Sequence, residues 1–328
     1  MAALLEVKNL RIELITRDGV APVIDDLSFI LNAGETLSFV GESGCGKSMT
    51  ALALMGLLPE KVGRVASGSI IFKGENLVQA SNDRMRAIRG NDISMIFQEP
   101  MTSLNPVFTI GEQIAEVLRA HQALSRKAAW SQAIELLDAV RIPNAKGRVS
   151  DYPFQMSGGQ RQRAMIAMAL ACRPKILIAD EPTTALDVTV QAQIFDLLSD
   201  LRQQTGAAII LITHDMGAVA EMAERMIVMY AGRKAELGPV DQIIDRPRHP
   251  YTKGLIECVP HIQDDPSSER HNLVEVPGIV PSLREFGKDQ CLFASRCPYV
   301  TETCLKSRPV AKQFKNDQSA DCWHAEAL

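Results

Sequence analysis

The sequence predicts an α/β protein with a mixed, largely parallel sheet, and three observations support this prediction. A glycine-rich motif, G-x-x-x-x-G-K-S at residues 41–48, lies between an apolar run at 37–40 and a segment of helix-forming composition at 49–55. Two further apolar runs, at 176–181 and 208–213, have the length of buried strands and are separated by a segment long enough for a helix. Between residues 110 and 140 the apolar residues recur instead at helical spacing.

Length, charge and hydropathy narrow the class of protein. The chain has 328 residues, which favours two subdomains with an appendage over one compact domain. Its 35 Lys and Arg residues are outnumbered by 39 Asp and Glu residues. This leaves no excess of positive charge for a nucleic acid backbone, so we expect no nucleic acid partner. No apolar run reaches the ~20 residues that cross a bilayer, so we expect a cytosolic chain that acts on a membrane through another protein.

The elements of the first half follow from apolar patterns and turn residues. Apolar and polar residues alternate at 4–14, as in a half-buried strand, and Asp18-Gly19 marks a turn after it. We expect these segments to form a small antiparallel sheet beside the glycine-rich motif. The expected elements are strands at 4–14, 23–31, 37–40, 69–72 and 93–97, and a helical insertion with helices at 110–124 and 127–140.

The glycine-rich motif matches a phosphate-binding loop. Its glycines let the backbone turn N–H groups toward an anion, and the start of the next helix adds a partial positive charge. We expect Lys47 to reach the β and γ phosphates of a nucleotide and the Ser48 hydroxyl to ligate Mg2+. The residues assigned to nucleotide binding here are Gly41, Glu42, Ser43, Gly44, Cys45, Gly46, Lys47, Ser48 and Met49.

A second glycine motif precedes the helix that we expect at 164–172. Ser157, Gly158, Gly159 and Gln160 would leave backbone N–H groups uncovered at a helix N-terminus, which makes a second anion-binding end. The same residues would also suit an ordinary helix cap. Taken alone, the motif leaves both interpretations open.

Two carboxylates, Asp180 and Glu181, end the apolar run that begins at Ile176. At a strand end Asp180 offers a hard oxygen ligand to the Mg2+ held by Ser48. Glu181 can orient or deprotonate a water for attack on the γ phosphate. A solvated acidic turn is the alternative. His214 follows the next apolar run and could hydrogen-bond the γ phosphate, although a lone His there is also typical of an ordinary loop.

Several motifs occur in a fixed order along the chain. The phosphate loop is followed by Gln98 at a strand end, Ser157–Gln160, the strand end 178–181, the segment 185–187 and His214. In this order they resemble the ATPase subunit of ATP-binding cassette (ABC) transporters. The resemblance spans roughly residues 4–245.

Finer detail resembles one branch of that family. The segments 97–106, 178–189 and 248–252, together with the cysteines near the C-terminus, are similar to the ATPases of bacterial dipeptide and oligopeptide importers. This implies a P-loop NTPase fold of the ABC ATPase type, with an antiparallel β subdomain, a helical subdomain and a small Cys-containing C-terminal extension.

The resemblance also implies a division of the chain into four segments. The first part of the nucleotide-binding core, with the antiparallel β subdomain and the phosphate loop, would be 1–100. The helical subdomain, ending in Ser-Gly-Gly-Gln, would be 101–160. The second part of the core, with the two carboxylates and the strand-end His, would be 161–245. The C-terminal extension with its four-Cys site would be 246–328.

The mechanism implied by the resemblance needs two ATPase subunits. ATP is held between the phosphate loop of one subunit and the Ser-Gly-Gly helix of the other, so Ser157–Gln160 would serve the partner's nucleotide. Glu181 would be the catalytic base and His214 would contact the γ phosphate. Gln98 would contact Mg2+ and the attacking water, and Asp187 would belong to the nucleotide site. The expected Mg2+ ligands are Ser48, Gln98 and Asp180.

The implied function is to hydrolyse ATP and thereby energise an importer of dipeptides or oligopeptides at the cytoplasmic membrane. The expected partners are a second, related ATPase, two transmembrane permease subunits and, indirectly, a periplasmic or extracellular substrate-binding protein. The chain would then be a peripheral protein on the cytoplasmic face of the membrane. The alternatives are an importer of nickel or another solute, and a soluble ABC ATPase with no role in transport.

Two positions depart from the family pattern. Met156 stands where Leu usually precedes Ser-Gly-Gly, a change that conserves volume and that we expect to be mild. The family often stacks adenine on an aromatic residue near the first strands, but no aromatic residue lies between Leu5 and Ile24. We expect an aliphatic contact, from Leu14 or Val23, in its place.

Four of the seven cysteines lie close together in the sequence, with the spacing C-x5-C-x6-C-x17-C. Four thiolates can ligate Zn2+ or a 4Fe-4S cluster, and these gaps do not match the tight hairpins of usual structural zinc sites. The resemblance implies an iron–sulfur cluster that clamps the tail. Zinc, and thiols without metal, are the alternatives. We expect segments 248–251 and 276–281 to position this tail against the partner ATPase. The four cysteines are Cys291, Cys297, Cys304 and Cys322.

Overall fold

The structure is a computed structural model that describes residues 3–99, 103–184, 186–259, 275–280 and 289–327. Residues 100–102, 185 and 281, which belong to segments singled out above, lie outside these ranges. The chain forms two compact units. Unit 1 comprises Met1–Leu5, Leu31–Thr36 and Phe72–Ile212, and unit 2 comprises Glu6–Ile30, Leu37–Ile71 and Thr213–Leu328. Within the described ranges, every helix is too short or too polar to cross a bilayer.

Unit 1 contains a parallel sheet of three fully buried strands. Strand β7 pairs in parallel with β6 on one side and with β8 on the other. All three strands are short and mostly apolar, with Ile-Ser-Met-Ile in β6 and runs of Ile, Leu and Ala in β7 and β8, as expected for parallel strands covered on both faces. The elements of unit 1 are β5 (Glu75–Asn76), η1 (Leu77–Gln79), α2 (Asn82–Ile88), β6 (Ile93–Ile96), α4 (Ile110–His121), α5 (Arg126–Ala139), α6 (Ala145–Arg148), η2 (Pro153–Gln155), α7 (Gly158–Leu170), β7 (Ile176–Asp180), α8 (Val188–Thr205) and β8 (Ala208–Ile212).

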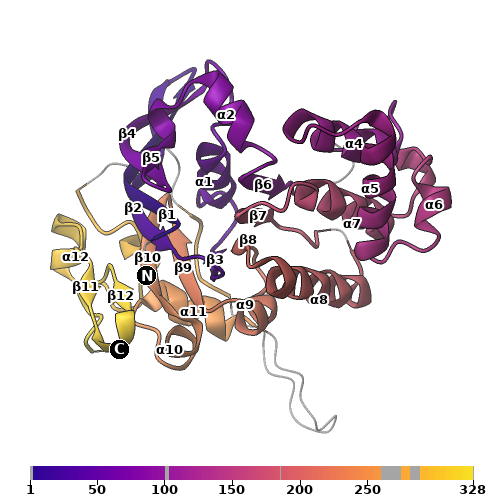
Figure 1. Cartoon of the computed structure of the whole chain (residues 1–328). Helices are drawn as coiled ribbons and strands as arrows, with labels where there is room; N and C mark the ends of the chain where they lie inside the picture. Colours follow the sequence, from indigo (N-terminus) through magenta and orange to yellow (C-terminus); the bar gives the residue numbers. More distant parts are fainter. Residues whose placement is uncertain (1–2, 100–102, 185, 260–274, 281–288, 328) are drawn as a thin grey trace, which may run out of the picture. The chain divides into compact units, whose positions relative to one another are not determined.

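The helices α4, α5, α6 and α7 form the helical part of unit 1 (Figure 1). Helix α4 begins with a capping box, in which the side chains of Thr109 and Glu112 each accept from the other's backbone N–H. Its apolar stripe includes Ile114 and Leu118, both of which are buried. Helices α4 and α5 pack against each other, and both pack against α7. The helical insertion expected from the sequence is therefore present, with ends that shift by only a few residues.

Unit 2 combines two groups of strands. In one group the strand order is β2-β1-β4, and in the other it is β11-β12-β10-β9-β3. Strands β3 and β9 are parallel, whereas β9, β10, β12 and β11 pair successively as antiparallel neighbours. The strands of unit 2 are β1 (Leu5–Thr16), β2 (Gly19–Leu31), β3 (Thr36–Val40), β4 (Gly63–Phe72), β9 (Arg225–Tyr230), β10 (Arg233–Pro239), β11 (Lys312–Gln313) and β12 (Ser319–Ala320). Its helices are α1 (Lys47–Leu54), α9 (Met216–Met222), α10 (Val240–Asp245), α11 (Pro250–Glu257), η4 (Ala294–Arg296), α12 (Glu302–Lys306) and η5 (Lys315–Asp317).

The C-terminal part of unit 2 packs into the core of that unit. Tyr251 and Phe293 belong to the same buried cluster as Val40 of β3 and Tyr230 of β9. The rings of Tyr230, Tyr251 and Phe293 meet with centroids 4.7 to 5.5 Å apart. Tyr251 and Phe293 thus anchor this part of the chain to the strand that leads into the phosphate loop.

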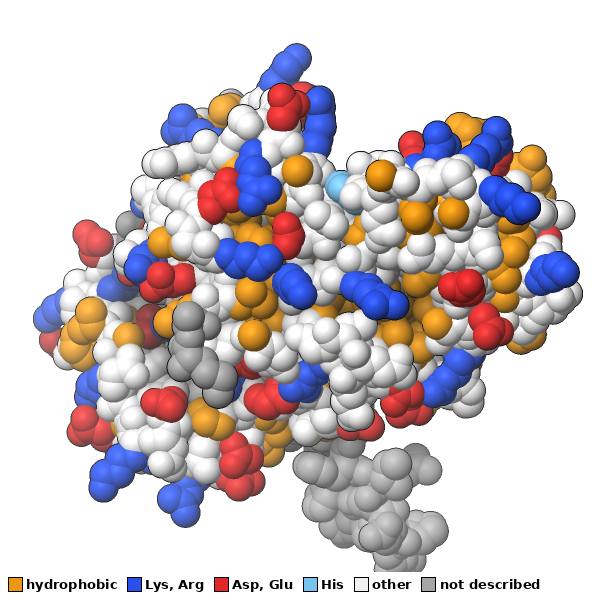
Figure 2. All heavy atoms as spheres, in the orientation of Figure 1, with side chains coloured by type: hydrophobic (Ala, Val, Ile, Leu, Met, Phe, Trp, Pro, Cys, Tyr) orange, Lys and Arg blue, Asp and Glu red, His pale blue; other side chains and the backbone are white. Residues whose placement is uncertain are grey.

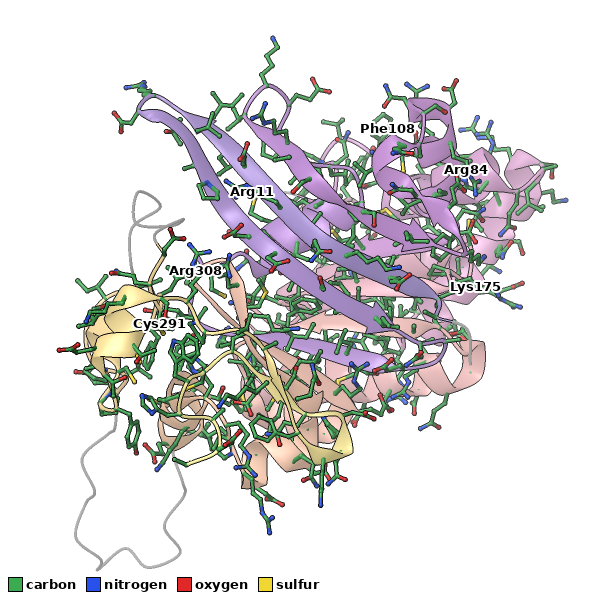
Figure 3. All side chains as sticks on the ribbon, turned by 90° about the vertical axis from the view of Figure 1, so that its left-hand side faces the viewer. Arg11, Arg84, Phe108, Lys175, Cys291 and Arg308 are labelled. Atoms are coloured by element: carbon green, nitrogen blue, oxygen red, sulfur yellow. The ribbon has the colours of Figure 1, made fainter. Side chains whose placement is uncertain are left out.

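An ion-pair cluster fixes the same part of the chain to the β2-β1-β4 strands. Asp25 on β2 pairs with Arg11 on β1, Arg233 on β10 and Arg308 of the C-terminal segment. The positions of Arg11 and Arg308 can be followed in Figure 3. Burial by itself would raise the pKa of Asp25, but the three arginines outweigh it and lower that pKa. The carboxylate is therefore held ionised among the three cations.

Candidate active site

The phosphate loop, residues 41–48, connects the buried strand β3 to helix α1, as the sequence predicts. Two of its glycines are required by geometry. Gly41 has φ of 145°, and a Cβ there would lie 2.3 Å from the carbonyl oxygen of Met229. Gly46, the N-cap of α1, has φ of 103°, and a Cβ there would lie 2.4 Å from Ile24 Cδ1. The loop can follow this close path only with glycine at both positions.

The side chain of Lys47 is held along the loop by the loop's own carbonyl groups. Its Nζ donates to the oxygen of Gly41 at 2.7 Å and to the oxygen of Glu42 at 3.2 Å. Cys45 is 1% exposed, with its Sγ 3.7 Å from Lys47 Nζ. Burial raises the pKa of the Cys45 thiol, so it is neutral at physiological pH and acts as a packing residue inside the loop.

The strand-end carboxylates lie in unit 1. Asp180 ends β7 and is buried. Glu181 follows with a left-handed backbone (φ 46°), which is uncommon for a residue other than glycine and orients its side chain differently from a continued strand. Its Oε2 accepts a 2.8 Å hydrogen bond from Gln98 Nε2 and a 2.9 Å hydrogen bond from Thr184 Oγ1. The structure thus brings together Gln98 and Glu181, two residues that the sequence singled out.

The Ser-Gly-Gly-Gln motif forms the N-terminus of α7. Ser157 Oγ accepts from the N–H of Gln160, and Gln160 Oε1 accepts from the N–H of Ser157. Helix α7 begins at Gly158 with Ser157 as its N-cap, as expected for a Ser-Gly-Gly helix start, and its first residues precede the range 164–172. Gly158 is exposed, whereas a Cβ on Gly159 would lie 3.0 Å from Val190 Cγ1 of α8. The capping interpretation is therefore correct for the fold, and it leaves the exposed backbone of Gly158 available to an anion.

Asp187 and Met156 both have structural roles in unit 1. Asp187 is the N-cap of α8, and its Oδ1 accepts from the N–H of Val190 at 3.0 Å. Met156 is 3% exposed and lies in the core directly before the Ser-Gly-Gly-Gln motif. That Met is tolerated there as a residue of Leu-like volume stays a prediction.

His214 follows β8 and shares a cavity with the phosphate loop within unit 2. The cavity has a volume of about 320 Å3, and its walls include His214, Gly41 and Glu42. Leu255 and Cys258, at the end of helix α11, also line it. An exposed imidazole on a cavity next to Gly41 is suited to contact a phosphate bound by the loop.

Of the two aliphatic residues suggested for the adenine contact, Val23 is 6% exposed and so is buried in the protein core. Leu14 on β1 is only partly buried. Leu14 therefore has the accessible surface that an adenine contact would require.

The segment 248–251 is largely buried within unit 2, and its expected role in positioning the tail against a partner ATPase stays a prediction. His249 is 4% exposed and Tyr251 is fully buried. Tyr251 Oη accepts a 2.8 Å hydrogen bond from the N–H of Glu42 in the phosphate loop. His249 caps α11, with its Nδ1 accepting from the N–H of Tyr251 at 3.1 Å. Pro250 occupies the first position of α11, and a proline there is a sequence signal that a helix begins at this point.

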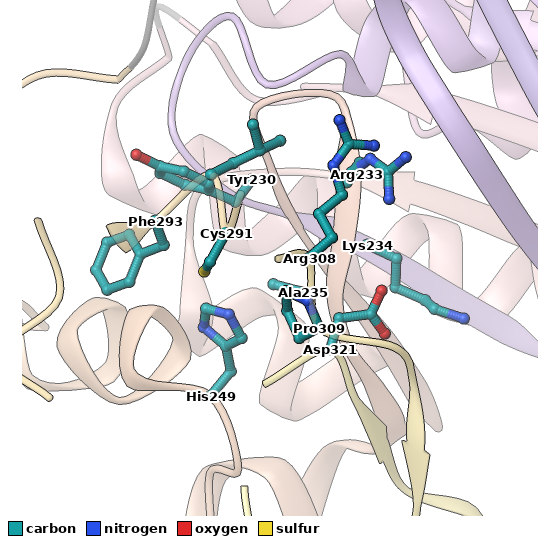
Figure 4. A pocket seen from close by; sticks show the side chains of 11 residues that line it. Tyr230, Arg233, Lys234, Ala235, His249, Cys291, Phe293, Arg308, Pro309 and Asp321 are labelled. Carbon is teal, nitrogen blue, oxygen red and sulfur yellow. The ribbon is translucent and has the colours of Figure 1, made fainter. Parts of the chain in front are cut away.

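The four clustered cysteines lie in the C-terminal part of unit 2. Cys304 and Cys322 are buried, Cys291 and Cys297 are partly buried, and none of the seven cysteines, all within the described residues, forms a disulfide. Figure 4 shows the Cys291 side chain beside those of His249 and Phe293. Burial, with a smaller contribution from the other three cysteines, raises the pKa of Cys322 to about 11. Across the described residues, no group of three or more His, Cys, Asp or Glu side chains is arranged to hold a metal ion.

One histidine that the sequence did not single out lies at this cluster. His324 Nε2 is 3.6 Å from Cys304 Sγ, and the N–H of His324 donates to Cys322 Sγ at 3.3 Å. A hydrogen bond from a backbone N–H favours the charged form of a thiol, so it opposes the effect of burial at Cys322.

Comparison with known proteins places this site in a family. The ABC transporter family matches residues 24–184, and the C-terminal region of oligopeptide/dipeptide transporters matches residues 235–304. A probable peptide ABC transporter ATP-binding protein of Sinorhizobium fredii is 49% identical over 325 residues, which cover 99% of this chain and 96% of that protein. The chain belongs to the ATP-binding proteins of ABC transporters.

Other relatives of this ABC ATPase agree with that assignment. The oligopeptide transport ATP-binding protein of Haemophilus influenzae is 51% identical over 323 residues, covering 98% of both chains. A solved ATP-binding cassette dimer, in a post-hydrolysis state with ADP and phosphate, is 27% identical with a TM-score of 0.65, covering 72% of this chain and 98% of that one. The expected ABC ATPase fold is therefore confirmed, and the chain is an ATPase by family.

Proposed function

We propose that the chain is the ATP-hydrolysing subunit of an importer for dipeptides or oligopeptides. The observation that carries this proposal is near-full-length identity of about half to peptide-transport ATP-binding proteins. The match includes the C-terminal region of oligopeptide/dipeptide transporters, which lies outside the nucleotide-binding motifs. The relatives named above give no support to a nickel importer or to an ABC ATPase outside transport.

The hydrolytic chemistry is assigned to Glu181 as the base. Its Oε2 is oriented by the donors Gln98 and Thr184, at 2.8 and 2.9 Å, which supports a fixed carboxylate that can accept a proton from water. His214, on the cavity that reaches Gly41, would hydrogen-bond the γ phosphate. Lys47 would release its bonds to the loop carbonyls and pair with the β and γ phosphates.

The proposed Mg2+ ligands are Ser48, Gln98 and Asp180. A hydroxyl, an amide oxygen and a carboxylate are the hard oxygen donors that Mg2+ prefers, so the donor set fits the ion. When bound, Mg2+ neutralises charge on the β and γ phosphates. Glu181, adjacent to Asp180, would then handle the proton while Asp180 serves the metal.

We also propose that two ATPase subunits share each nucleotide. The exposed Ser157 and Gly158 at the start of α7 support this role, because a helix N-terminus with an exposed glycine suits a phosphate on a facing subunit. Asp187, at the start of α8, would lie at the same interface. The solved cassette relative is itself a dimer. We propose a related, non-identical ATPase as the partner.

The surface proposed to dock on the permease subunits is the apolar patch formed by Val107, Phe108, Tyr152 and Phe154 in unit 1. Phe154 is 69% exposed and Val107 is 71% exposed. The rings of Tyr152 and Phe154 are stacked with centroids 5.5 Å apart. Figure 2 shows apolar side chains exposed on the helical part of unit 1, and Figure 3 labels Phe108.

Hydrogen bonds hold the two halves of this apolar patch next to each other. The N–H of Ile110 donates to the Asp151 oxygen at 2.9 Å, and the N–H of Gly111 donates to the Val149 oxygen at 2.8 Å. Gln113 is 7% exposed and uses its amide to bind the backbone of Asn105 and Phe108. A fixed, exposed aromatic surface of this kind suits a protein partner. The chain would thereby sit on the cytoplasmic face of the membrane, bound to two permease subunits that receive peptide from a substrate-binding protein.

For the C-terminal extension, 246–328, we propose a 4Fe-4S cluster on Cys291, Cys297, Cys304 and Cys322. The mutual effect of the four thiols on the pKa of Cys322 supports their proximity. Their side chains would have to rearrange to ligate, since no group of side chains among the described residues is arranged to hold a metal ion. Anaerobic purification followed by iron and sulfide analysis tests this cluster: about four of each per chain supports it, whereas zinc or no metal refutes it.

We also propose that the remaining divisions of the chain, 1–100, 101–160 and 161–245, are its functional segments.

The transport proposal is tested on membranes and on uptake. We expect a tagged chain, extracted from membranes in mild detergent, to retain two permease subunits and a second ATPase, identified by mass spectrometry. Cells in which Glu181→Gln replaces the native protein should lose uptake of labelled dipeptide or oligopeptide. Unchanged peptide uptake with loss of nickel uptake, or recovery of ribosomes or DNA in place of permeases, would contradict the proposal.

A further inference from the structure

Arg296 connects the C-terminal part of the chain to the phosphate loop. It lies in η4, directly before Cys297, and its side chain is 2% exposed. Its Nη1 donates to Glu42 Oε2 at 2.8 Å, and its Nη2 donates to Glu42 Oε1 at 3.0 Å. This two-point geometry fixes both the position and the plane of the carboxylate, which a lysine could not do.

The guanidinium of Arg296 is itself held in place. Its Nε donates to the Pro277 oxygen at 2.7 Å, and its Nη2 also donates to the Val276 oxygen at 3.1 Å. The rings of Tyr230 and Phe293 lie 5.7 and 5.9 Å from its Cζ. A buried cation with this many fixed partners is organised before Glu42 meets it.

Glu42 is therefore anchored at two points by residues near the C-terminus. Its carboxylate is bound by Arg296, and its backbone N–H donates to Tyr251 Oη. The backbone oxygen of the same residue accepts from Lys47 Nζ. Glu42 is thus the residue of the phosphate loop that contacts both the C-terminal extension, through Arg296 and Tyr251, and Lys47.

Charge explains why such an anchor is needed. Glu42 is the second residue of a loop that binds a polyanion, and a mobile carboxylate there would repel the phosphates. Arg296 neutralises this carboxylate and holds it in a fixed direction. We propose that Arg296 is a positioning residue for nucleotide binding, acting through Glu42. The proposal rests on the assignment of residues 41–48 as the ATP site.

The test measures the affinity for a fluorescent ATP analogue in the full chain, together with kcat and KM for ATP. We expect Arg296→Met to raise the Kd about tenfold and to raise the KM similarly, with kcat changed little. Adding Glu42→Gln to Arg296→Met should restore most of the affinity, because the repelling carboxylate is then absent. An arginine that only packed the extension would give no such recovery.

Arg308→Met is the matched control, since Arg308 also joins the C-terminal segment to a carboxylate, that of Asp25. It should leave the ATP affinity within about twofold of the wild-type value. If Arg296→Met does not fold, Arg296→Lys with and without Glu42→Gln gives the same comparison with a smaller expected loss, about threefold. Unchanged affinity in the Arg296 variants, or no recovery with Glu42→Gln, would overturn the proposal. Failure of the wild-type chain to bind the analogue would instead refute the ATP site itself.

Discussion

The side-chain amide of Gln98 donates a 2.8 Å hydrogen bond to the carboxylate of Glu181. Gln98 follows β6 and Glu181 follows β7, and these strands are parallel neighbours in unit 1. The two side chains therefore meet because the carboxyl ends of adjacent parallel strands lie at one edge of the sheet. A neutral donor at this position orients the carboxylate without adding a second negative charge.

Replacing that neutral donor by an acid should shift the pH dependence of hydrolysis. In Gln98→Glu the new carboxylate lies beside Glu181 and disfavours its charged form, so the acid limb of kcat/KM should move up by about one pH unit. Gln98→Leu is the control: it removes the hydrogen bond without adding charge, so it should lower the rate and move the limb up by clearly less than Gln98→Glu does. An acid limb that stays in place in Gln98→Glu would argue against Glu181 as the base.

The proposed role of Ser157 in the partner's nucleotide site can be separated from its role as a helix cap. Asn caps a helix about as well as Ser, so Ser157→Asn should leave the free energy of unfolding within about 0.5 kcal/mol of wild type. Loss of the small hydroxyl at a shared phosphate site should nevertheless lower kcat about a hundredfold in the assembled transporter. Full activity of Ser157→Asn would place the motif outside the nucleotide site.

The apolar patch of Val107, Phe108, Tyr152 and Phe154 predicts where the permease binds. Phe154→Asp puts a charge into that surface, so we expect co-purification with the permease to be lost while ATP binding by the isolated chain is retained. Val310→Asp introduces the same charge at another highly exposed apolar residue, in the C-terminal segment. That control should keep the permease. Retention of the permease by Phe154→Asp would show that docking uses another surface.

Acid should destabilise the protein through His249. Burial lowers the pKa of His249 to about 4, from 6.5 in the unfolded chain. Because the folded-state pKa is the lower one, the unfolded chain binds the proton first as pH falls below 6.5. The stabilising effect of the neutral imidazole is then lost progressively down to pH 4. The expected loss is about 3 kcal/mol of the free energy of unfolding.

His249→Asn removes this titration while an amide oxygen can still cap α11. The difference in free energy of unfolding between wild type and His249→Asn, measured by urea denaturation, should therefore change by about 3 kcal/mol between pH 7 and pH 4. Glu236 and Asp321 have raised pKa values, so they act in the opposite direction, but they are present in both proteins and cancel in the difference. A difference that does not depend on pH would contradict a buried neutral His249.

Local sequence was enough to predict the phosphate loop and the strand ends. The loop depends on glycines at fixed positions between an apolar strand and a helix, and all of these lie within one short stretch of chain. The apolar runs at 93–97, 176–181 and 208–213 likewise became β6, β7 and β8 with small changes at their ends. Periodicity and turn residues carry this information because each element buries its own apolar residues.

Contacts between distant segments could not be predicted in the same way. Tyr251 and Arg296 bind Glu42 across 209 and 254 residues, and no local pattern marks such pairs. The burial of the segment 248–251 likewise depends on distant residues, because Tyr251 packs against the rings of Tyr230 and Phe293. A partial signal did exist for β9, since residues 226–230 form an apolar run of strand length.

The central claim is that Glu181 carries the hydrolysis that drives transport, and single-turnover hydrolysis of ATP by Glu181→Gln in the assembled transporter tests it most directly. Gln has nearly the same shape and can still accept the hydrogen bonds from Gln98 and Thr184, but it is a far weaker base. We therefore expect ATP to bind with wild-type affinity and to remain uncleaved, with the rate reduced at least about a thousandfold. Cleavage at a rate close to that of wild type would contradict the account.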